Sequence, residues 1–422
     1  MSGVSGPDIA PGDADRVLAE FRPGLRIYIQ GAIGEPLALR EILSSAPDAL
    51  AGTDLIAGLL PGMNDFDYAA LHPAAHLTVF LLPPALRASF ELGRIDVRPA
   101  PYSAIAAAFL EGPPLDLAVL QVTAPDAEGR CSFGPCADFA PLVWPRATRR
   151  VAFVNSSLPP ARRGPTIPLA AIEVVVEADG PFITGEDAAP GADQLAIAER
   201  VAGLIPDGAA IQTGIGGAPA AAVATLADHR NLVVRSGMVT EGYRALAEVG
   251  ALAAGARHVT GVAFGPEGFM RWAAEAFEFA DAATTHGAAA LAGVERLHAI
   301  NSALQIDLFG QANVEWRGGR LVSGLGGAPD FARAARRSPG GRGILALPST
   351  AGGGGLSRIV ARLGGPTVSI PRDDADLVVT EHGVADLRGA GLDARAETLI
   401  AIAAPQHRHR LAREWETIGQ GL

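Results

Sequence analysis

The sequence predicts an α/β protein built from two similar open α/β domains, and three observations support this prediction. Short β-branched runs alternate with helical patterns along the chain, as in proteins with parallel sheets. A strand, a glycine loop and a helix open each half of the chain in the same order. The glycine loops stand at the expected carboxyl ends of strands, where open α/β sheets bind their ligands.

The predicted strands define two domains separated by a loop-rich boundary. The first half is expected to form strands at residues 26–30, 76–81, 117–122 and 150–154. The second half is expected to form strands at residues 210–212, 231–235, 258–262, 297–306, 343–346 and 377–380. Residues 178–192 between the halves are rich in Gly, Pro and Asp. We therefore predict an N-terminal domain over residues 1–185 and a C-terminal domain, which carries the glycine loops, over residues 186–422.

The two halves repeat each other. Residues 23–31 (PGLRIYIQG) lead into AIGEP, and residues 206–212 (PDGAAIQ) lead into TGIGGAP. Each opening is typical of a turn, a short apolar strand, a glycine loop and a helix that begins near a proline. Further matches pair residues 120–122 (LQV) with 304–306 (LQI), and 138–140 (DFA) with 330–332 (DFA). These spacings are too long for a solenoid repeat and predict a duplicated domain, with Ile29 and Gln30 equivalent to Ile211 and Gln212.

The composition excludes several classes of protein. The chain of 422 residues is 49% hydrophobic and 19% charged, which is typical of a globular protein. Its 34 basic residues are all arginine, so no lysine can form a Schiff base, hold pyridoxal phosphate or serve a P-loop. The net charge of −11 argues against nucleic acid as the main partner. Bound phosphate would have to contact arginine, backbone N–H groups or helix N-termini.

Other features predict a cytoplasmic protein without a metal site or a membrane span. Cys131 and Cys136 form neither a C-x-x-C motif nor a zinc pattern, and are expected to be reduced packing residues. Residues 1–15 lack the basic and apolar regions of a signal peptide. The uncharged run at residues 208–227 is interrupted by Gln212, glycines and a proline, which argues against a transmembrane helix. None of the nine histidines has the spacing of metal ligands.

Two glycine loops in the second half are candidate ligand-binding segments. Residues 214–219 read GIGGAP, and residues 324–330 read GLGGAPD. The first loop is not a dinucleotide fingerprint, because Pro219 stands in place of the last glycine. On this pattern alone, both a structural turn and a ligand-binding loop remain open.

The wider sequence resembles the acetyl-CoA hydrolase/transferase family, which includes the 4-hydroxybutyrate CoA-transferases, over nearly the whole chain. The motifs that carry the resemblance are residues 115–129, 132–134, 211–219, 301–313 (NSALQIDLFGQAN), 324–331 (GLGGAPDF), 357–360 (SRIV) and 380–389 (TEHGVADLRG). The resemblance implies a duplicated CoA-transferase-type fold with the active site in a cleft between the domains. It also implies acyl-CoA, and possibly a small carboxylate, as substrates. No cofactor beyond coenzyme A as substrate is expected, and a homodimer or homotetramer is the default assembly.

The resemblance also assigns roles to individual residues. By likeness, the first loop would contact CoA and the second would approach its thioester end; the residues are Gly214, Ile215, Gly216, Gly217, Ala218, Gly326 and Gly327. Transferases of the family use a glutamate carboxylate to attack the acyl-CoA, which gives a glutamyl-CoA thioester. The family pattern at that glutamate is Leu-Gly-Ile-His-Thr/Ser-Glu-Met, whereas residues 232–238 here read LVVRSGM. Gly237 therefore stands at the nucleophile position, and Arg235 replaces the histidine.

A glycine cannot form the thioester, so other residues become candidates. Glu241 lies near an expected helix start and Glu381 follows an expected strand, and each has a structural role as its alternative. Gln305 could hold a carbonyl group or a water molecule, and Glu315 follows the NSALQIDLFGQAN motif. Ser236 lacks the G-x-S-x-G context of a nucleophile and is expected to be a cap. Arginines after the second loop are predicted to bind CoA phosphates or to lie on a surface helix: Arg333, Arg336, Arg337 and Arg342.

Three functions remain open from the sequence. The favoured hypothesis is an enzyme that acts on an acyl-CoA thioester without a glutamyl intermediate, with hydrolysis preferred. The second is a CoA-transferase that uses another carboxylate or a direct route between substrates. The third is an acyl-CoA-binding protein without turnover.

Overall fold

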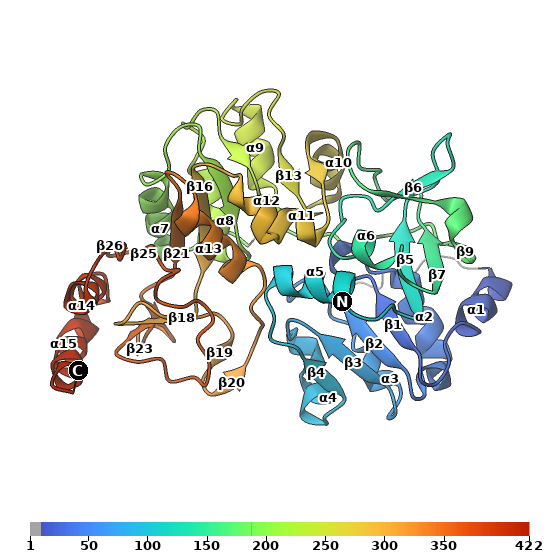
Figure 1. Ribbon diagram of the computed structural model, residues 1–422, viewed down its shortest axis with the longest axis horizontal. Coiled ribbons are helices and arrows are strands. Elements are labelled where there is room, and N and C mark those ends of the chain that lie inside the picture. The colour runs from blue at the N-terminus through green and yellow to red at the C-terminus, as the bar shows by residue number, and fades with distance from the viewer. Residues whose placement is uncertain (1–9, 187, 422) are drawn as a thin grey trace. The chain divides into compact units, whose positions relative to one another are not determined.

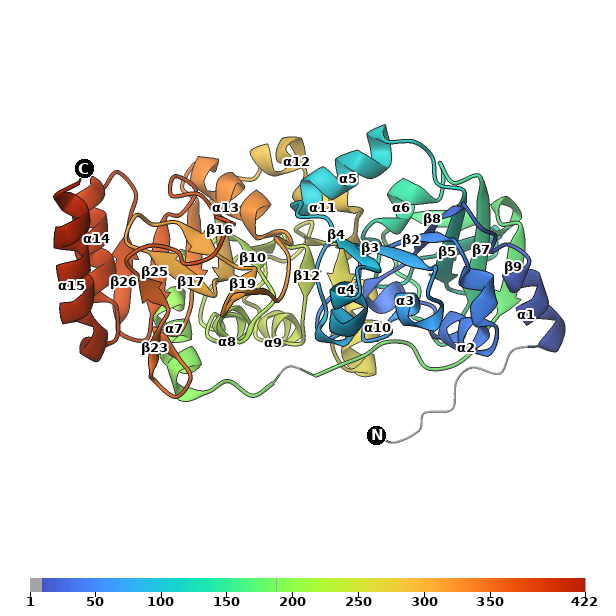
Figure 2. The same ribbon diagram turned by 90° about the horizontal axis from the view of Figure 1, so that it is seen from below.

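The computed structural model describes residues 10–186 and 188–421, and the chain divides into two compact units. Among these residues, the first unit contains 10–186 together with 259–285, and the second contains 188–258 together with 286–421. Each unit is built on a mainly parallel sheet with helices on both faces, so the predicted α/β fold class is confirmed (Figures 1 and 2).

The first unit is built on a sheet of seven parallel strands. From one edge to the other these are β4 (Ile95–Val97), β3 (His76–Val79), β2 (Asp54–Ala57), β1 (Arg26–Ile29), β5 (Leu117–Val122), β7 (Arg149–Val154) and β9 (Val174–Glu177). Its helices are α1 (Pro11–Leu18), α2 (Leu37–Ser45), α3 (Tyr68–Leu71), α4 (Arg87–Glu91), α5 (Tyr102–Glu111), α6 (Ala140–Val143) and α10 (Glu267–Ala276). Figure 2 shows α5 and α6 on one face of this sheet, and α2, α3 and α4 on the other. The remaining strands of the unit are short: β6 (Arg130–Ser132), β8 (Thr166–Pro168), β13 (Val259–Thr260), β14 (Val262–Ala263) and β15 (Glu278–Phe279).

The second unit is built on a six-stranded sheet whose last strand is antiparallel. In spatial order the strands are β11 (Val233–Val234), β10 (Ala210–Thr213), β16 (Leu297–Ser302), β21 (Arg342–Ala346), β25 (Leu377–Thr380) and β26 (Gly383–Asp386). Its helices are α7 (Ala192–Ala202), α8 (Gly217–Ala224), α9 (Gly242–Glu248), α12 (Ala288–Ala292), α13 (Ala328–Arg337), α14 (Leu392–Ala401) and α15 (Pro405–Gly419). A further helix, α11 (Ala282–His286), begins in the first unit, and its last residue, His286, is where the chain returns to the second unit. Figure 2 shows α7 and α8 on one face and α13 on the other, while α14 and α15 lie side by side beyond β26. Short strands complete it: β12 (Met238–Val239), β17 (Gln305–Asp307), β18 (Ala312–Asn313), β19 (Trp316–Arg317), β20 (Arg320–Leu321), β22 (Thr350–Ala351), β23 (Leu356–Ser357) and β24 (Ile359–Val360).

The two sheets share a core of five parallel strands, as the internal repeat predicts: β2-β1-β5-β7-β9 in the first unit and β11-β10-β16-β21-β25 in the second. β3 and β4 extend the first sheet, and antiparallel β26 extends the second. In each unit the first strand, β1 or β10, lies between the second strand and the strand that begins the other half of the sheet, β5 or β16. The glutamine near the end of the first strand reaches that neighbour in both units. Gln30 accepts a 2.9 Å hydrogen bond from the Gln121 N–H, and the amides of Gln212 and Asn301 exchange hydrogen bonds of 3.0 and 3.2 Å. Gln30 and Gln212 therefore bridge equivalent strand pairs.

One of the matched tripeptides is not structurally equivalent. Residues 120–122 lie in β5 of the main sheet, whereas residues 304–306 belong to a small separate sheet around β17. The other match holds, because residues 138–140 and 330–332 both stand at the helix that precedes the next sheet strand, α6 or α13. The equivalence inferred from LQV and LQI is thus wrong.

The expected single boundary between domains differs from the observed division. The predicted strand at residues 258–262 becomes β13 and β14, and neither strand joins the second sheet. The Ala137 N–H donates to the Gly261 carbonyl, the Ala263 N–H to the Pro135 carbonyl and the Phe279 N–H to the Arg163 carbonyl, at 2.8 to 2.9 Å. These long-range backbone bonds place residues 259–285 in the first unit, so residues 186–422 do not form one contiguous domain.

Burial on both faces explains why the central strands were recognisable. All six residues of β5 are buried, as are all four of β10. Parallel strands covered by helices are continuous apolar runs, which is the pattern found in the sequence. No helix in the described part of the chain combines the length and the apolar character needed to cross a membrane.

Candidate functional site

The first glycine loop connects β10 to α8 and packs closely against the end of β16. An added Cβ at Gly216 would lie 2.6 Å from the Ser302 hydroxyl oxygen, and one at Gly214 would overlap the Asn301 amide. Gly216 also has a φ of 139°, a conformation that other residues rarely adopt. These glycines are required by the packing of the protein itself. Ile215, by contrast, is 50% exposed at the tip of the loop, and its predicted contact with CoA stays a prediction.

The second glycine loop leads into α13. Gly326 has a φ of 58° with open space around its Cα, and Gly327 is the residue that caps the helix. The backbone N–H groups at this helix N-terminus carry partial positive charge, which suits a developing oxyanion. The predicted role of Gly326 and Gly327 near a thioester is untested by these contacts but compatible with them.

A buried histidine, His286, lies against both Gly237, the predicted nucleophile position, and the second loop. An ideal Cβ at Gly237 would be 2.6 Å from both Cε1 and Nε2 of His286. An ideal Cβ at Gly327 would be 2.5 Å from the same Nε2. The His286 ring also meets the Phe331 ring edge to face, with centroids 5.0 Å apart. Residues far apart in the sequence thus enclose one imidazole, and a side chain at either glycine would overlap it.

The His286 ring is neutral at physiological pH in this environment. The residue is 6% exposed, and burial lowers the pKa of its imidazole to about 3. A neutral imidazole keeps one nitrogen lone pair for accepting a proton or a hydrogen bond. Gly237 itself has no positive φ, so the backbone there does not require glycine; the His286 ring does.

Ser236 serves the backbone, as the sequence predicts. Its hydroxyl lies 2.7 Å from the Met238 carbonyl oxygen and 3.2 Å from the Thr213 carbonyl oxygen. It also accepts a 3.4 Å hydrogen bond from the Thr213 N–H. A serine held this way joins the turn at Gly237 to β10 and is not poised as a nucleophile.

The four remaining candidate side chains, three carboxylates and one amide, differ in their hydrogen bonds and burial. Glu381 accepts hydrogen bonds from the N–H (2.8 Å) and the hydroxyl of buried Ser349, and lies 3.4 Å from His382. Buried Glu315 accepts a 2.7 Å bond from the Ser369 hydroxyl. Glu241, half-buried, precedes α9, and within the described residues its carboxylate forms no hydrogen bond or ion pair. Gln305 is half-buried at the start of β17.

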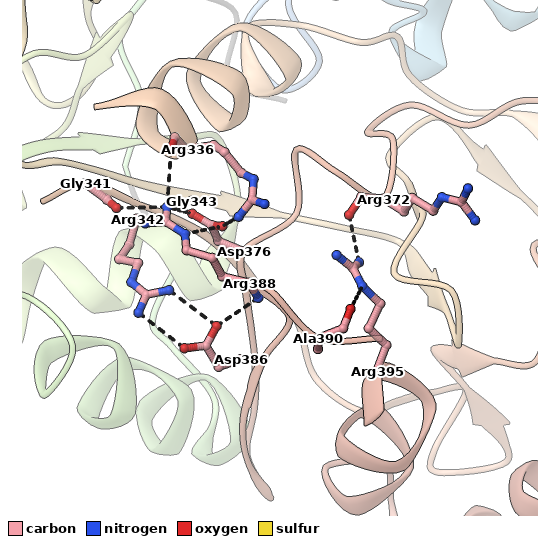
Figure 3. Close-up of polar contacts among 10 residues, drawn as sticks. All are labelled: Arg336, Gly341, Arg342, Gly343, Arg372, Asp376, Asp386, Arg388, Ala390 and Arg395. Atoms are coloured by element: carbon pink, nitrogen blue, oxygen red, sulfur yellow. Dashed lines mark hydrogen bonds and ion pairs between the residues drawn. The ribbon is translucent and has the colours of Figure 1, made fainter. Parts of the chain in front are cut away.

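The arginines after the second loop are mostly paired inside the second unit. Arg333 lies 2.9 Å from Asp374 and Arg342 lies 3.2 Å from Asp386, while Arg336 pairs with Asp376. Figure 3 shows Arg336 and Arg388 converging on the Asp376 carboxylate, which also accepts from the Gly343 N–H. Arg337 is exposed. The carboxylates that precede and follow β25 neutralise these charges, which favours the structural explanation over phosphate binding.

Neither the cysteines nor the histidines suggest a metal. Cys131 and Cys136 are both free and buried, and burial raises the pKa of each thiol. Within residues 10–186 and 188–421, no group of three or more His, Cys, Asp or Glu side chains is arranged to hold a metal ion.

Sequence reasoning missed His286. The residue follows two threonines at the end of a short helical pattern and belongs to no motif. Glycine at position 237 indicates that another group fills the space that a larger side chain would occupy. Only the fold shows that this group comes from the end of α11.

Known proteins resemble both halves of this chain. The model of the acetyl-CoA hydrolase/transferase N-terminal domain matches residues 13–184, and that of the C-terminal domain matches residues 265–415. The chain is 31% identical to the 4-hydroxybutyrate coenzyme A transferase of Clostridium kluyveri, over 96% of each chain. It is 34% identical to a succinyl-CoA:acetate/propanoyl-CoA:succinate CoA transferase of Fasciola hepatica, over 95% of this chain and 86% of that protein. Among solved structures, a 4-hydroxybutyrate CoA-transferase from Porphyromonas gingivalis aligns with a TM-score of 0.80 and 29% identity, over 96% of each chain.

Proposed function

Because the chain belongs to the acetyl-CoA hydrolase/transferase family, we propose that it hydrolyses an acyl-CoA thioester without forming a glutamyl-CoA intermediate. The observation that carries this proposal is the state of position 237. Gly237 offers no carboxylate, and the His286 ring already occupies the space where a side chain would begin. Loss of a catalytic nucleophile in a well-studied enzyme costs about 10⁶ in kcat, so the two-step exchange route through residue 237 is negligible here.

The other candidate carboxylates differ in how readily they could replace a nucleophile at position 237. The Glu381 carboxylate is bound by Ser349, and Glu315 is buried against Ser369. A nucleophile in either place would have to leave these hydrogen bonds before attacking the substrate, at a cost of about 1–3 kcal/mol. Glu241 is free of such bonds within the described residues and is the better candidate for the alternative function, CoA transfer through another carboxylate.

The binding contacts complete the proposal. The loop at residues 214–218 would hold CoA, with exposed Ile215 against the ligand. The backbone N–H groups at Gly326 and Gly327 would stabilise the oxyanion that forms when water attacks the thioester carbonyl. The products are the free acid and CoA, and no cofactor beyond CoA takes part. We expect a homodimer or homotetramer, which light scattering would test.

The experiment measures CoA release from a series of acyl-CoA substrates, with and without acetate or succinate. Hydrolysis releases CoA at the same rate in both conditions, and in ¹⁸O-labelled water one labelled oxygen enters the free acid. Release that requires the carboxylate acceptor and is lost in Glu241→Gln would establish transfer instead. CoA binding without any release would establish a non-catalytic binding protein.

A further inference from the structure

We infer that His286 is the general base of this hydrolysis, an imidazole that acts from the end of α11 in place of the missing side chain at 237. This inference rests on the proposed function and names the group that would carry it out. Its basis is the position of one ring nitrogen, which lies against both Gly237 and Gly327.

His286, Gly237 and Gly327 depend on one another sterically. Nε2 would be 2.6 Å from a Cβ at 237 and 2.5 Å from a Cβ at 327, both far inside van der Waals contact. Neither position can carry a side chain while His286 keeps this placement. Gly237 shows no positive φ and Gly327 has a φ of −89°, so the backbone does not explain either glycine. The imidazole explains both.

The ring is placed where the chemistry is expected. The family resemblance puts the attacking group at position 237 and the thioester near Gly326 and Gly327. Nε2 of His286 lies 2.6 Å from an ideal Cβ at 237 and 2.5 Å from one at 327, so it stands between the predicted positions of the attacking group and the electrophile. Phe331, edge to face with the ring, fixes the ring plane from α13. A positioned imidazole of this kind suits proton transfer to and from a water molecule.

His286 can carry the proton through both halves of the hydrolysis. The neutral imidazole takes a proton from water while the water oxygen bonds to the thioester carbon, giving a tetrahedral oxyanion and an imidazolium. Burial disfavours the imidazolium, but the oxyanion formed beside it carries the opposite charge, and the two attract strongly where water is excluded. Collapse of the oxyanion breaks the C–S bond, and the imidazolium returns its proton to the leaving thiolate. Water and thioester become acid and thiol, with no change of oxidation state.

The opposing explanation is that His286 only fills space. Substitution by Gln keeps much of the volume and the polarity but removes the base. We expect His286→Gln to lower the rate constant of hydrolysis by at least about 100-fold, since general bases contribute 10²- to 10⁴-fold. CoA affinity and the unfolding midpoint should stay close to wild type. The matched control is His298→Gln, another buried histidine of the second unit, which should retain wild-type hydrolysis.

A rescue experiment separates base from filler. His286→Gly opens a cavity the size of the ring, and added imidazole should restore hydrolysis in a saturable way. Pyrazole has the same ring size but is a far weaker base, so it should fill the cavity without restoring the rate. Equal rescue by both compounds, or full activity of a folded His286→Gln variant, would overturn the assignment, as would an acyl group trapped on His286. If the wild-type protein releases no CoA without an acceptor, the proposed function fails before the role of His286 is reached.

Discussion

At position 237, the space that a side chain would enter is filled by the imidazole ring of His286, a residue 49 positions later in the chain. The His286 imidazole explains why position 237, the predicted nucleophile position, holds glycine although its backbone has no positive φ. The sequence alone identified Gly237 as a departure from the family pattern. It could not identify His286, because the contact depends on where α11 ends and not on any local spacing.

A first prediction concerns restoring a carboxylate at this position. Gly237→Glu alone should destabilise the protein by about 1–3 kcal/mol, because its Cβ overlaps the His286 ring and the core must shift. Combined with His286→Gly, the same glutamate has room, and stability should recover. Urea unfolding measures both effects, and intact-mass spectrometry after incubation with acyl-CoA should detect a CoA adduct only in the double variant. A stable single variant that forms the adduct would show that His286 does not block the site.

Asp138 is a second residue whose burial has a measurable consequence. It has a φ of 43° and is 5% exposed, and burial raises the pKa of its carboxyl to about 7, opposed by a hydrogen bond from the Phe139 N–H. The folded-state pKa therefore exceeds the unfolded value of 3.8. The favourable contribution of this group is fully present below pH 3.8 and is lost as the pH rises to about 7.

Asp138→Asn should remove this pH dependence. The amide cannot ionise, and asparagine tolerates the left-handed backbone well. We expect the variant to be more stable than wild type by roughly 1–3 kcal/mol at pH 8, with little gain at pH 4. Unfolding by urea at the two pH values tests this. Asp48→Asn, on a side chain that is 98% exposed, is the control and should show no such difference. An unchanged stability difference between pH 4 and pH 8 in Asp138→Asn would refute the assignment.

At the scale of elements, the predicted contact between CoA and the loop that joins β10 to α8 is better tested at Ile215 than at the glycines of the loop. A Gly216→Val change would lose the required φ and overlap Ser302 whether or not CoA binds, so it cannot report on the ligand. Ile215 is half exposed and can be changed without disturbing the packing. Ile215→Asp should weaken CoA binding about tenfold by placing a carboxylate beside the CoA phosphates.

Calorimetry with free CoA measures this effect. Leu392→Asp is the matched control, since Leu392 is 38% exposed at the start of α14, in the same unit. Equal CoA affinities for wild type and Ile215→Asp would move the CoA site away from this loop.

Arg333 and Arg336 of α13 form ion pairs with Asp374 and Asp376, which directly precede β25. Asp376 is fully buried between Arg336 and Arg388 (Figure 3). Burial raises the pKa of its carboxyl and is the largest single influence. The hydrogen bonds from Arg388, Arg336 and the Gly343 N–H together outweigh it and lower the pKa. A depressed folded-state pKa means stability that is present above the unfolded pKa and is lost as the pH falls through the folded pKa.

Asp376→Asn should accordingly cost about 3 kcal/mol at pH 7, because it leaves two arginines without their carboxylate. The cost should begin to shrink as the pH falls below the unfolded-state pKa of 3.8, and it should disappear only when the pH falls through the lower folded-state pKa, where the wild-type carboxyl is protonated too. Urea unfolding measures it, and Glu414→Gln, which breaks an exposed i,i+4 pair with Arg410, should cost no more than about 0.5 kcal/mol. Similar losses for both variants would mean that the buried network contributes nothing special.

The two strands whose bounds were predicted without error, β5 and β25, are buried along their whole length. β5 and β25 were predicted with their observed bounds, and β1, β7, β10 and β21 to within one residue. β4 and β9 were missed at the two edges of the first sheet, where the strands are only three and four residues long. β2 lies inside the same sheet, between β1 and β3, and was missed because its apolar run is only three residues long. The segment at residues 297–306 contains two strands in different sheets, β16 and β17, and no local signal marks the break.

At the scale of the whole molecule, the internal repeat predicted the shared sheet topology but not the division of the chain. Residues 259–285 belong to the first unit through backbone hydrogen bonds to residues 135–163, which a search for repeats and linkers cannot reveal. The family was predictable because its motifs line the loops after the strands. The surroundings of position 237 were only partly predictable, because the sequence shows that the residue is glycine and only the fold shows that His286 lies against it.

The central claim is that this enzyme acts on a thioester without carrying CoA covalently. Intact-mass spectrometry of the wild-type protein, quenched during incubation with acyl-CoA, tests it most directly. We predict an unmodified mass, together with continued CoA release and no inactivation by borohydride. A species heavier by one CoA, mapped to Glu241, Glu315 or Glu381, would contradict the account and establish a transferase that has moved its nucleophile.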